Sequence, residues 1–356
     1  MNKRTLIICL IILNLISIIS LYSSLHQEGR LKDGNILYKQ ILWLVIFWIV
    51  IIAVSFINYR IYYDAGIYIY IINILLLIGV ILFGQEKMGA QRWFSVFGLN
   101  FQPSEFSKLA VVILLARCFS FAAIREKHIF LRKVILPFSL VAINSLLIFK
   151  QPDLGTAGIL IIVFFMIGLS SRINKRYFIG IIIAGMIISP FGWELLKDYQ
   201  KKRLTVFLTP DVDPLGAGYT IIQSKIAIAS GRIFGKGFLA GTQNQFNFLP
   251  ERHTDFIFTV LAEEFGFIGC LFLLFIYSLI LRIIINKMAH IKDNFAQLIC
   301  IGIYSTIFLH IFINIGMTMG LVPVVGLPLL FLSYGGTHLI ITAIFIGVFL
   351  NISKQC

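Results

Sequence analysis

Charged side chains are scarce in this chain: they make up 13% of its 356 residues, whereas hydrophobic residues make up 59%. A typical soluble domain has roughly 25% charged residues, and its surface does not tolerate such extensive apolar area. The mean hydropathy of +0.93 leads to the same conclusion. The composition therefore excludes a soluble protein and indicates one that lies in a membrane.

Cysteine is also rare, with five residues in the whole chain. These residues are far apart and show none of the paired spacings typical of zinc sites or of small disulfide-linked domains. We therefore expect small apolar packing residues at all five positions: Cys9, Cys118, Cys270, Cys300 and Cys356.

Long apolar segments fill most of the chain, each close to the ~20 residues that a helix needs to cross a bilayer. They are rich in Ile, Leu and Phe and lack the alternation of barrel strands, so they favour helices. The first lacks a signal-peptide cleavage site and is expected to be retained. We predict an all-α polytopic membrane protein, a single integral membrane domain over residues 1–356. About ten transmembrane helices are expected, at residues 5–22, 40–57, 67–84, 103–122, 134–150, 154–170, 177–195, 256–281, 295–318 and 334–351.

The distribution of Lys and Arg predicts the orientation in the membrane. Basic residues gather in short alternate connections, such as 125–133 and 172–176, which the positive-inside rule places in the cytoplasm. Both termini are then cytoplasmic. The extracytoplasmic side has a large loop at about 196–255 and a Pro- and Gly-rich stretch at 320–336. We interpret that stretch as a re-entrant loop, because irregular backbone at membrane depth must be buried or line a cavity.

Within the large loop, apolar residues at 219, 222, 226 and 229 form one helical stripe, which predicts an interfacial helix over 219–230. The following segment, Gly231 to Gly237, lacks the spacing and the Ser or Thr of a phosphate-binding loop. A nucleotide site is therefore excluded there. The surplus of basic residues in the large loop suits an anionic substrate or anionic lipid headgroups.

Asp255 lies where a charged loop enters a long apolar segment, with Arg252 and His253 before it and Glu263-Glu264 after it. A carboxylate in that place is costly unless it is hydrated, paired or functional. The clustering predicts a polar cavity that opens toward one face of the membrane. The structural alternative for Asp255 is a helix N-cap.

Other polar clusters lie at the predicted outer ends of helices. Glu105 and Lys108 are three residues apart and share a helix face, Arg92 adjoins Trp93, and Asp153 precedes a helix. Each cluster has a structural alternative. Glu105 and Lys108 could form a local ion pair at a capped helix start, Arg92 could anchor at the interface, and Asp153 could be an N-cap.

These motifs together resemble the SEDS family (shape, elongation, division and sporulation), and within it the rod-shape branch rather than the division branch. The resemblance covers essentially the whole chain. It rests on an ordered set of motifs: Arg92-Trp93, Phe101 to Glu105, Pro152 to Thr156, Asp213 to Tyr219, Gln223 to Ala227, Gly241-Thr242-Gln243, Leu249 to Phe258, Glu263-Glu264 and Gly320 to Gly336.

The resemblance implies a peptidoglycan glycosyltransferase of the bacterial cytoplasmic membrane. Such an enzyme polymerises lipid II into glycan strands at the extracytoplasmic face during cell elongation and rod-shape maintenance. The resemblance also implies a class B penicillin-binding protein as the crosslinking partner, further membrane proteins of the elongation complex, and no nucleic-acid partner.

The implied reaction assigns roles to residues. Asp255 is the expected catalytic base, which takes the proton of the attacking sugar hydroxyl. The diphosphate leaving group needs cations as its charge develops. A divalent cation such as Mg²⁺ or Mn²⁺ could share that work, and the sequence leaves this alternative open. The expected substrate-binding residues are Arg92, Glu105, Lys108, Asp153, Lys225, Arg252, Thr254 and Ser333.

Two other function classes remain open from the residues alone. A lipid II flippase would also combine many helices, a re-entrant loop and intramembrane carboxylates. It should, however, place polar residues along a path to both sides, whereas the polar motifs crowd one face. A non-catalytic scaffold for cell-wall enzymes explains the helices but leaves the acidic and basic clusters without a role.

Overall fold

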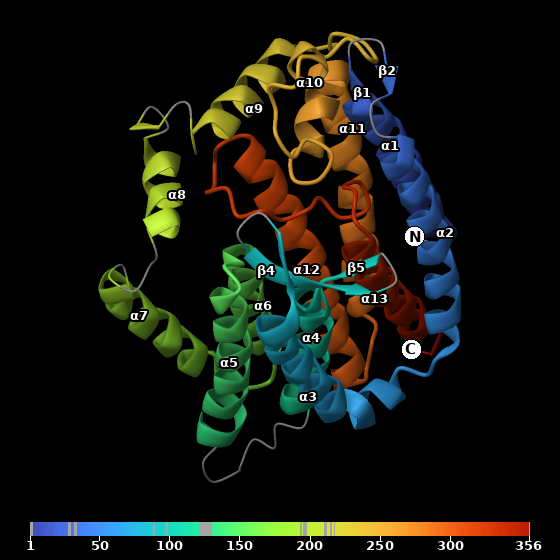
Figure 1. The fold of residues 1–356 in the computed structure, drawn as a ribbon. Helices are drawn as coiled ribbons and strands as arrows, with labels where there is room; N and C mark the ends of the chain where they lie inside the picture. Colours follow the sequence, from blue (N-terminus) through green and yellow to red (C-terminus); the bar gives the residue numbers. More distant parts are fainter. Residues whose placement is uncertain are drawn as a thin grey trace. The chain divides into compact units, whose positions relative to one another are not determined.

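The computed structural model describes residues 3–27, 30–31, 34–87, 90–96, 99–120, 130–192, 194, 198–209, 212–213, 216 and 218–355. Figure 1 draws its helices and strands. The chain forms two compact units, each assembled from three separate stretches. Unit 1 comprises Met1–Val45, Ser189–Ile283 and Phe308–Gly335, and unit 2 comprises Ile46–Ile188, Ile284–Ile307 and Gly336–Cys356.

Unit 1 contains the N-terminal helix and the helices of the large loop. Four helices begin in one unit and end in the other: α2 (Gly34–Phe56), α7 (Lys175–Gly192), α11 (Ile257–Met288) and α12 (Asn294–Thr318). The elements wholly or largely in unit 1 are α1 (Lys3–Leu25), β1 (His26–Gln27), β2 (Arg30–Leu31), α8 (Asp198–Leu208), α9 (Tyr219–Ser230), α10 (Thr242–Gln245) and α11 (Ile257–Met288).

Unit 2 contains a group of helices around α4 and a small sheet. Its elements include α3 (Arg60–Phe83), β3 (Gln85–Lys87), β4 (Ala90–Val96), β5 (Leu99–Phe101), α4 (Pro103–Ser120), the π-helix η1 (Leu131–Ile135), α5 (Leu136–Lys150), α6 (Leu154–Ser170), most of α7 (Lys175–Gly192) and α13 (Gly336–Gln355). The helices α2 (Gly34–Phe56) and α12 (Asn294–Thr318) each contribute one part to it.

Each of the ten predicted apolar segments coincides with a helix, although the ends of 103–122 and 177–195 lie outside the described residues. Among the described residues, seven helices are long and apolar enough to cross a membrane: α1, α2, α3, Leu131–Lys150, α11, α12 and α13. Helix α6 is apolar but shorter. Helix α4 carries three charged residues, Glu105, Lys108 and Arg117, and polar residues of this kind are buried inside a helix group rather than exposed to lipid.

Helix α4 is the central helix of unit 2 and is buried along most of its length. It packs against α3, α6 and α13. Glycine permits the close approach of one neighbour, because a Cβ atom at Gly302 of α12 would lie 2.4 Å from a methyl carbon of Val112. This packing holds the first turn of α4 in a fixed place within the unit.

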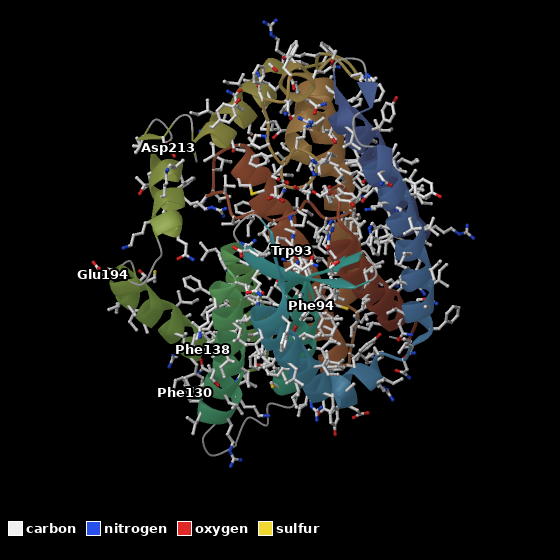
Figure 2. The ribbon with its side chains drawn as sticks, in the orientation of Figure 1. Trp93, Phe94, Phe130, Phe138, Glu194 and Asp213 are labelled. Carbon is white, nitrogen blue, oxygen red and sulfur yellow. The ribbon has the colours of Figure 1, made fainter. Side chains whose placement is uncertain are left out.

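Two small antiparallel sheets were not predicted from the sequence. Strand β1 pairs with β2, and β3, β4 and β5 form a three-stranded sheet in which Phe94 lies opposite Phe101. Figure 2 labels Trp93 and Phe94 on β4. Strands this short give no clear alternation in the sequence.

The large loop contains the predicted helix over 219–230, since α9 spans Tyr219–Ser230. Its buried Ser224 donates to the carbonyl of Thr318 at 2.7 Å. The predicted irregular stretch near 320–336 is confirmed as non-helical backbone between α12 and α13. Gly320 and Gly326 there have φ of +71° and +70°, which glycine adopts readily and other residues adopt at a cost.

Helix α11 differs from its prediction. It extends to Met288 and is broken at Gly266, where φ is +63° and ψ is −160°. This combination is essentially open only to glycine. The apolar segment therefore forms two helical pieces, Ile257 to Phe265 and Phe267 to Met288, rather than one continuous helix.

Candidate active site

Asp255 lies in a turn, over residues 251–256, that leads into α11. The backbone N–H groups of Thr254 and Asp255 donate to the carbonyl of Glu251 at 3.2 and 3.1 Å. Asp255 is half-buried. It is thus held by a short turn just before a helix, a place where its carboxylate can meet both protein and solvent.

Three consecutive carbonyls in this turn each accept a hydrogen bond from the 308–335 stretch of unit 1. The backbone N–H of Tyr334 donates to the carbonyl of His253 at 3.0 Å. The hydroxyl of Ser333 donates to the carbonyl of Thr254 at 2.5 Å, and the side-chain amide of Asn314 donates to that of Asp255 at 2.8 Å. The backbone that carries Asp255 is therefore fixed residue by residue.

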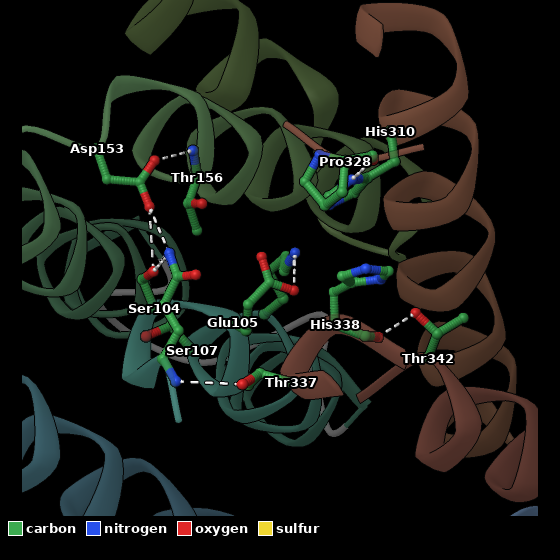
Figure 3. A network of polar contacts seen from close by, with 12 residues as sticks. Ser104, Glu105, Ser107, Asp153, Thr156, His310, Pro328, Thr337, His338 and Thr342 are labelled. Carbon is green, nitrogen blue, oxygen red and sulfur yellow. Dashed lines mark hydrogen bonds and ion pairs between the residues drawn. The ribbon is translucent and has the colours of Figure 1, made fainter. Parts of the chain in front are cut away.

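Asn314 is a buried residue of α12 and links two segments. Its amide nitrogen also donates to the carbonyl of Leu327 at 2.7 Å. One turn earlier on the same helix, His310 Nδ1 lies 3.1 Å from the carbonyl of Pro328, and Figure 3 draws this contact. A Cβ atom at Gly326 would lie 3.4 Å from Asp255 Oδ2. The 319–335 stretch thus lies against the Asp255 carboxylate.

The other expected site residues of unit 1 make protein contacts. Arg252 is buried and donates to the carbonyl of Ser24 at 2.7 Å and to Asn247 Oδ1 at 2.6 Å. Lys225 is exposed, and its Cε would lie 2.3 Å from a Cβ atom at Gly320, so its stem runs over that glycine. Arg252 therefore fixes the end of α1, while Lys225 remains the more accessible cation.

Thr254 and Ser333 were expected to bind substrate, and the structure brings them together. The Thr254 hydroxyl lies 3.1 Å from a carboxylate oxygen of Glu251. Ser333 is fully buried and accepts from the backbone N–H of Leu329 at 2.9 Å. These contacts position the turn that carries Asp255, which is a structural role compatible with a nearby substrate.

Glu263 and Glu264 lie one to two turns into α11, both buried. Glu263 Oε1 pairs with Lys236 Nζ at 2.7 Å and accepts from Thr242 Oγ1 at 3.2 Å and from the backbone N–H of Gln243 at 3.1 Å. Glu264 accepts from the hydroxyl of Ser23. The two carboxylates hold the large loop and the end of α1 rather than standing apart as a second catalytic pair.

Unit 2 holds the remaining expected residues, and Figure 3 shows several of them. Glu105 Oε2 and Lys108 Nζ form an ion pair at 2.7 Å, with side chains only 5% and 2% exposed. The local ion pair named as the alternative is therefore present. Buried charge pairs of this kind are costly to form and more costly to break.

Asp153 and Arg92 also bind protein groups. Asp153 is the N-cap of α6 and accepts from the backbone N–H of Thr156 at 3.1 Å, and its second oxygen accepts from Ser104 at 3.1 Å. Arg92 donates to the carbonyls of Gln151 and Pro152 at 2.8 and 2.5 Å. The N-cap alternative for Asp153 is thus present, and Arg92 binds the carbonyls that follow α5.

Three helices begin close together in this part of unit 2. Asp153 connects the start of α6 to the start of α4 through Ser104. The hydroxyl of Thr337, at the start of α13, accepts from the backbone N–H of Gln102 at 3.3 Å, next to α4. Helix N-termini carry partial positive charge and bind anions. The starts of α4, α6 and α13 thus meet in a cluster that also holds the Glu105–Lys108 pair and the Asp153 carboxylate.

A metal site does not emerge from these residues. Within the described ranges, the structure shows no group of three or more His, Cys, Asp or Glu side chains that could hold a metal ion. Of the expected substrate-binding residues, the two carboxylates Glu105 and Asp153 bind Lys108 and the backbone N–H of Thr156.

Sequence reasoning missed Asn314, Lys236 and the three converging helix starts. Asn314 is an amide deep within the apolar sequence of α12, far from Asn294 and Gln297 at the start of the helix. A polar group inside a membrane helix is a signal of function or close packing. Its partners could not be identified, because Asn314 and Asp255 are 59 positions apart.

Curated relatives cover most of the chain. It is 39% identical to the peptidoglycan glycosyltransferase MrdB of Escherichia coli K12, over 90% of this chain and 86% of that protein. It is 32% identical to the peptidoglycan glycosyltransferase RodA of Treponema pallidum, over 98% of this chain and 97% of that protein. With its apolar helices, the chain is a multi-pass bacterial membrane protein.

Solved structures share the fold. One, described as structural coordination of polymerization and crosslinking by a peptidoglycan synthase complex, matches with a TM-score of 0.84 and 27% identity, over 99% of this chain and 98% of that one. The Thermus thermophilus rod shape determining protein RodA matches with a TM-score of 0.72 and 23% identity, over 98% and 96%. A family model described as "Cell cycle protein", FtsW/RodA/SpoVE, matches residues 3–356. The chain therefore belongs to the FtsW/RodA/SpoVE family, as the resemblance to SEDS proteins predicted.

Proposed function

We propose that this chain is a peptidoglycan glycosyltransferase that polymerises lipid II into glycan strands during cell elongation, with Asp255 as its catalytic base. Family membership and relatives with that enzyme name support the activity. The observation that carries the role of Asp255 is the set of three hydrogen bonds to the carbonyls of His253, Thr254 and Asp255. Such fixed backbone pre-organises a catalytic group, which lowers the cost of reaching the reactive geometry.

The reaction requires one proton transfer and one exchange of bonds. The 4-hydroxyl oxygen of the acceptor sugar bonds to the anomeric carbon of the donor, and the bond from that carbon to the lipid diphosphate breaks. The hydroxyl proton passes to the carboxylate of Asp255, and the electron pair of the broken bond leaves with the diphosphate. A positioned carboxylate typically contributes about 10²- to 10⁴-fold to such a step.

The cluster in unit 2 suits the anionic part of a lipid-diphosphate substrate. It combines the starts of α4, α6 and α13 with Lys108, and helix N-termini favour phosphate oxygens. Glu105 holds Lys108, and Asp153 holds the helix starts together. Arg92 fixes the connection between α5 and α6. We therefore assign these four residues to forming the substrate-binding cluster.

Lys225, Arg252, Thr254 and Ser333 form the corresponding set in unit 1. Lys225 is the exposed cation among them and is assigned to the substrate. The contacts of Arg252, Thr254 and Ser333 assign these residues to holding the Asp255 turn in place.

The proposal places both termini in the cytoplasm and the Asp255 turn on the extracytoplasmic face. The partner assigned to it is a class B penicillin-binding protein, supported by the matching structure of a peptidoglycan synthase complex. In intact cells, an impermeant maleimide should label Ala240→Cys in the large loop, and it should leave the native terminal Cys356 unlabelled. The reverse pattern would overturn this orientation.

Glycan synthesis from purified lipid II tests the activity. Wild type with its cognate penicillin-binding protein should form long strands, whereas Asp255→Asn should form none. The matched control is Asp293→Asn, which keeps the N-cap oxygen that binds the backbone N–H of Phe295. Equal amounts of polymer from wild type and Asp255→Asn would contradict the role of Asp255 and would favour the flippase or scaffold alternative.

A further inference from the structure

The break in α11 is bridged by a segment of the large loop, residues 231–237, which we call the 231–237 loop. An unbroken helix would bond the N–H groups of residues 267 and 268 to the carbonyls of Glu263 and Glu264. Instead, those carbonyls accept from the backbone N–H groups of Lys236 and Gly237, each at 3.0 Å. The freed N–H groups of Phe267 and Ile268 donate to the carbonyls of Arg232 and Ile233, at 2.9 and 3.1 Å.

Glycines allow this close contact between the loop and the helix. A Cβ atom at Gly231 would lie 2.0 Å from the carbonyl oxygen of Ala262, and one at Gly235 would lie 2.0 Å from that of Glu264. Gly235 also has φ of +82°. Four backbone hydrogen bonds and close backbone contact therefore fix the position of the loop along α11, next to Gly266.

The length of the second helical piece of α11, Phe267 to Met288, indicates that Gly266 lies at a membrane boundary. From Phe267 to Met288 it is about 33 Å long at ~1.5 Å per residue, and the hydrocarbon core of a bilayer is ~30 Å thick. Two basic residues near the far end, the exposed Arg282 and Lys287 in the last turn, suit the headgroups at the far side, which the long Arg282 side chain reaches by snorkelling. Gly266 then lies at the opposite boundary, and the buried Glu263 and Glu264 lie outside the hydrocarbon core, on the headgroup side of Gly266.

The apolar surface of α11 continues onto the 231–237 loop at this boundary. Phe267 and Ile268, the first residues below the break, are 59% and 50% exposed. Bonded to them through the backbone, the loop presents Ile233 at 58% and its neighbour Phe234 at 80% exposure. Phe267 and Ile268 belong to a candidate membrane span, so the exposed residues of the loop continue a surface that such a span would turn toward lipid.

We propose that the 231–237 loop is an interfacial lipid anchor, in which Ile233 and Phe234 insert into the bilayer leaflet nearest Gly266. The exposed Arg232 and the partly exposed Lys236 flank them, as cations flank apolar residues at the headgroup level. Under the proposed orientation this leaflet is the outer one. The anchor concerns lipid contact alone and is independent of whether Asp255 is the catalytic base.

Depth-dependent quenching of a fluorophore tests the anchor. Phe234→Cys, in a variant whose five native cysteines are replaced, is labelled with an environment-sensitive dye and reconstituted without any partner protein into phosphatidylcholine–phosphatidylglycerol vesicles. The anchor predicts blue-shifted emission and strong quenching by lipids that carry a spin label near the headgroup. Water-like emission without quenching would overturn the lipid anchor. The exposed Ile233 and Phe234 would then be assigned to contact with a protein partner.

Three further labels make the result unambiguous. Phe275→Cys lies about 13 Å deeper on the exposed face of α11 and should respond best to a spin label deep in the chains. Ala240→Cys, on the far side of Gly237 and exposed, should keep water-like emission. Ile233→Cys repeats the test if Phe234→Cys is not monodisperse. Quenching of the labels at positions 233 and 234 only by the deep spin label, or not at all, contradicts an interfacial anchor.

Discussion

The side-chain amide nitrogen of Asn314 lies 2.8 Å from the main-chain oxygen of Asp255, and the same nitrogen lies 2.7 Å from that of Leu327. One buried amide thus joins the turn of the proposed base to the glycine- and proline-rich stretch beside it. Asn314 is therefore a positioning residue in this account, since it reaches Asp255 through the backbone.

Replacing Asn314 by Leu should lower the turnover rate of glycan synthesis. The carbonyls of Asp255 and Leu327 would lose this donor, and a shift of the base by about 1 Å can cost roughly 10²-fold. The measurement is kcat and KM with lipid II, with Thr318→Val as the control. That residue lies one turn further along, and its hydroxyl bonds only within its own helix. A variant with normal kcat and merely lower thermal stability would contradict the positioning role.

Breaking the buried pair of Glu105 and Lys108 should affect stability and activity differently. Lys108→Met leaves a buried carboxylate without its cation, which costs about 3–5 kcal/mol. Adding Glu105→Gln removes that charge and should restore most of the thermal stability. Glycan synthesis should stay low in the double variant, because the cation beside the helix starts is still missing. Recovery of synthesis together with stability would show that the pair is only structural.

Gly266→Ala should destabilise the protein by more than ~2 kcal/mol, because φ of +63° with ψ of −160° is nearly closed to alanine. The new Cβ atom would also lie 2.3 Å from the backbone nitrogen of Gly235. Gly158→Ala is the matched control, since its Cβ would meet nothing within 4 Å on helix α6; it should be neutral or stabilise by about 0.5–1 kcal/mol. Thermal unfolding followed by tryptophan fluorescence measures both, and similar unfolding temperatures would refute the assigned strain.

Lys236→Met should loosen the large loop, because the buried carboxylate of Glu263 would lose the ammonium group that pairs with it at 2.7 Å. The expected cost is about 2–4 kcal/mol, less than for a fully buried pair, since the Lys236 side chain is 26% exposed. Faster proteolysis within residues 231–245 is the local measurement. Lys292→Met, an exposed cation elsewhere, serves as the reference, and equal cleavage of the two variants would argue against this role for Lys236.

The helices were predictable from the sequence because apolar length is a strong signal in a membrane protein. The helix over 219–230 followed from one stripe of apolar residues and is confirmed by α9. The break at Gly266 was not predicted, because its cause is the distant 231–237 loop, whose backbone replaces the lost helical bonds. The small sheets were missed because each strand is too short to show a pattern.

The candidate site was predictable by residue type but not by partner. Asp255 was selected because a carboxylate at the start of a membrane helix is costly without a function. The sequence offered the N-cap of α6 as the alternative for Asp153, but it did not show that Asp153 also binds Ser104 or that Arg92 binds two carbonyls. Those contacts depend on which helix ends meet, and spacing along the chain carries no information about that.

The most direct test of the central claim is the initial rate of strand formation from lipid II by wild type and by Asp255→Asn, each with the cognate penicillin-binding protein. The three hydrogen bonds to the carbonyls of His253, Thr254 and Asp255 remain possible in Asp255→Asn, and the unfolding temperature of each protein is measured alongside the rate. Loss of about 10²- to 10⁴-fold or more in rate is the predicted result. A rate for Asp255→Asn within a few-fold of wild type would contradict the assignment of Asp255 as the catalytic base.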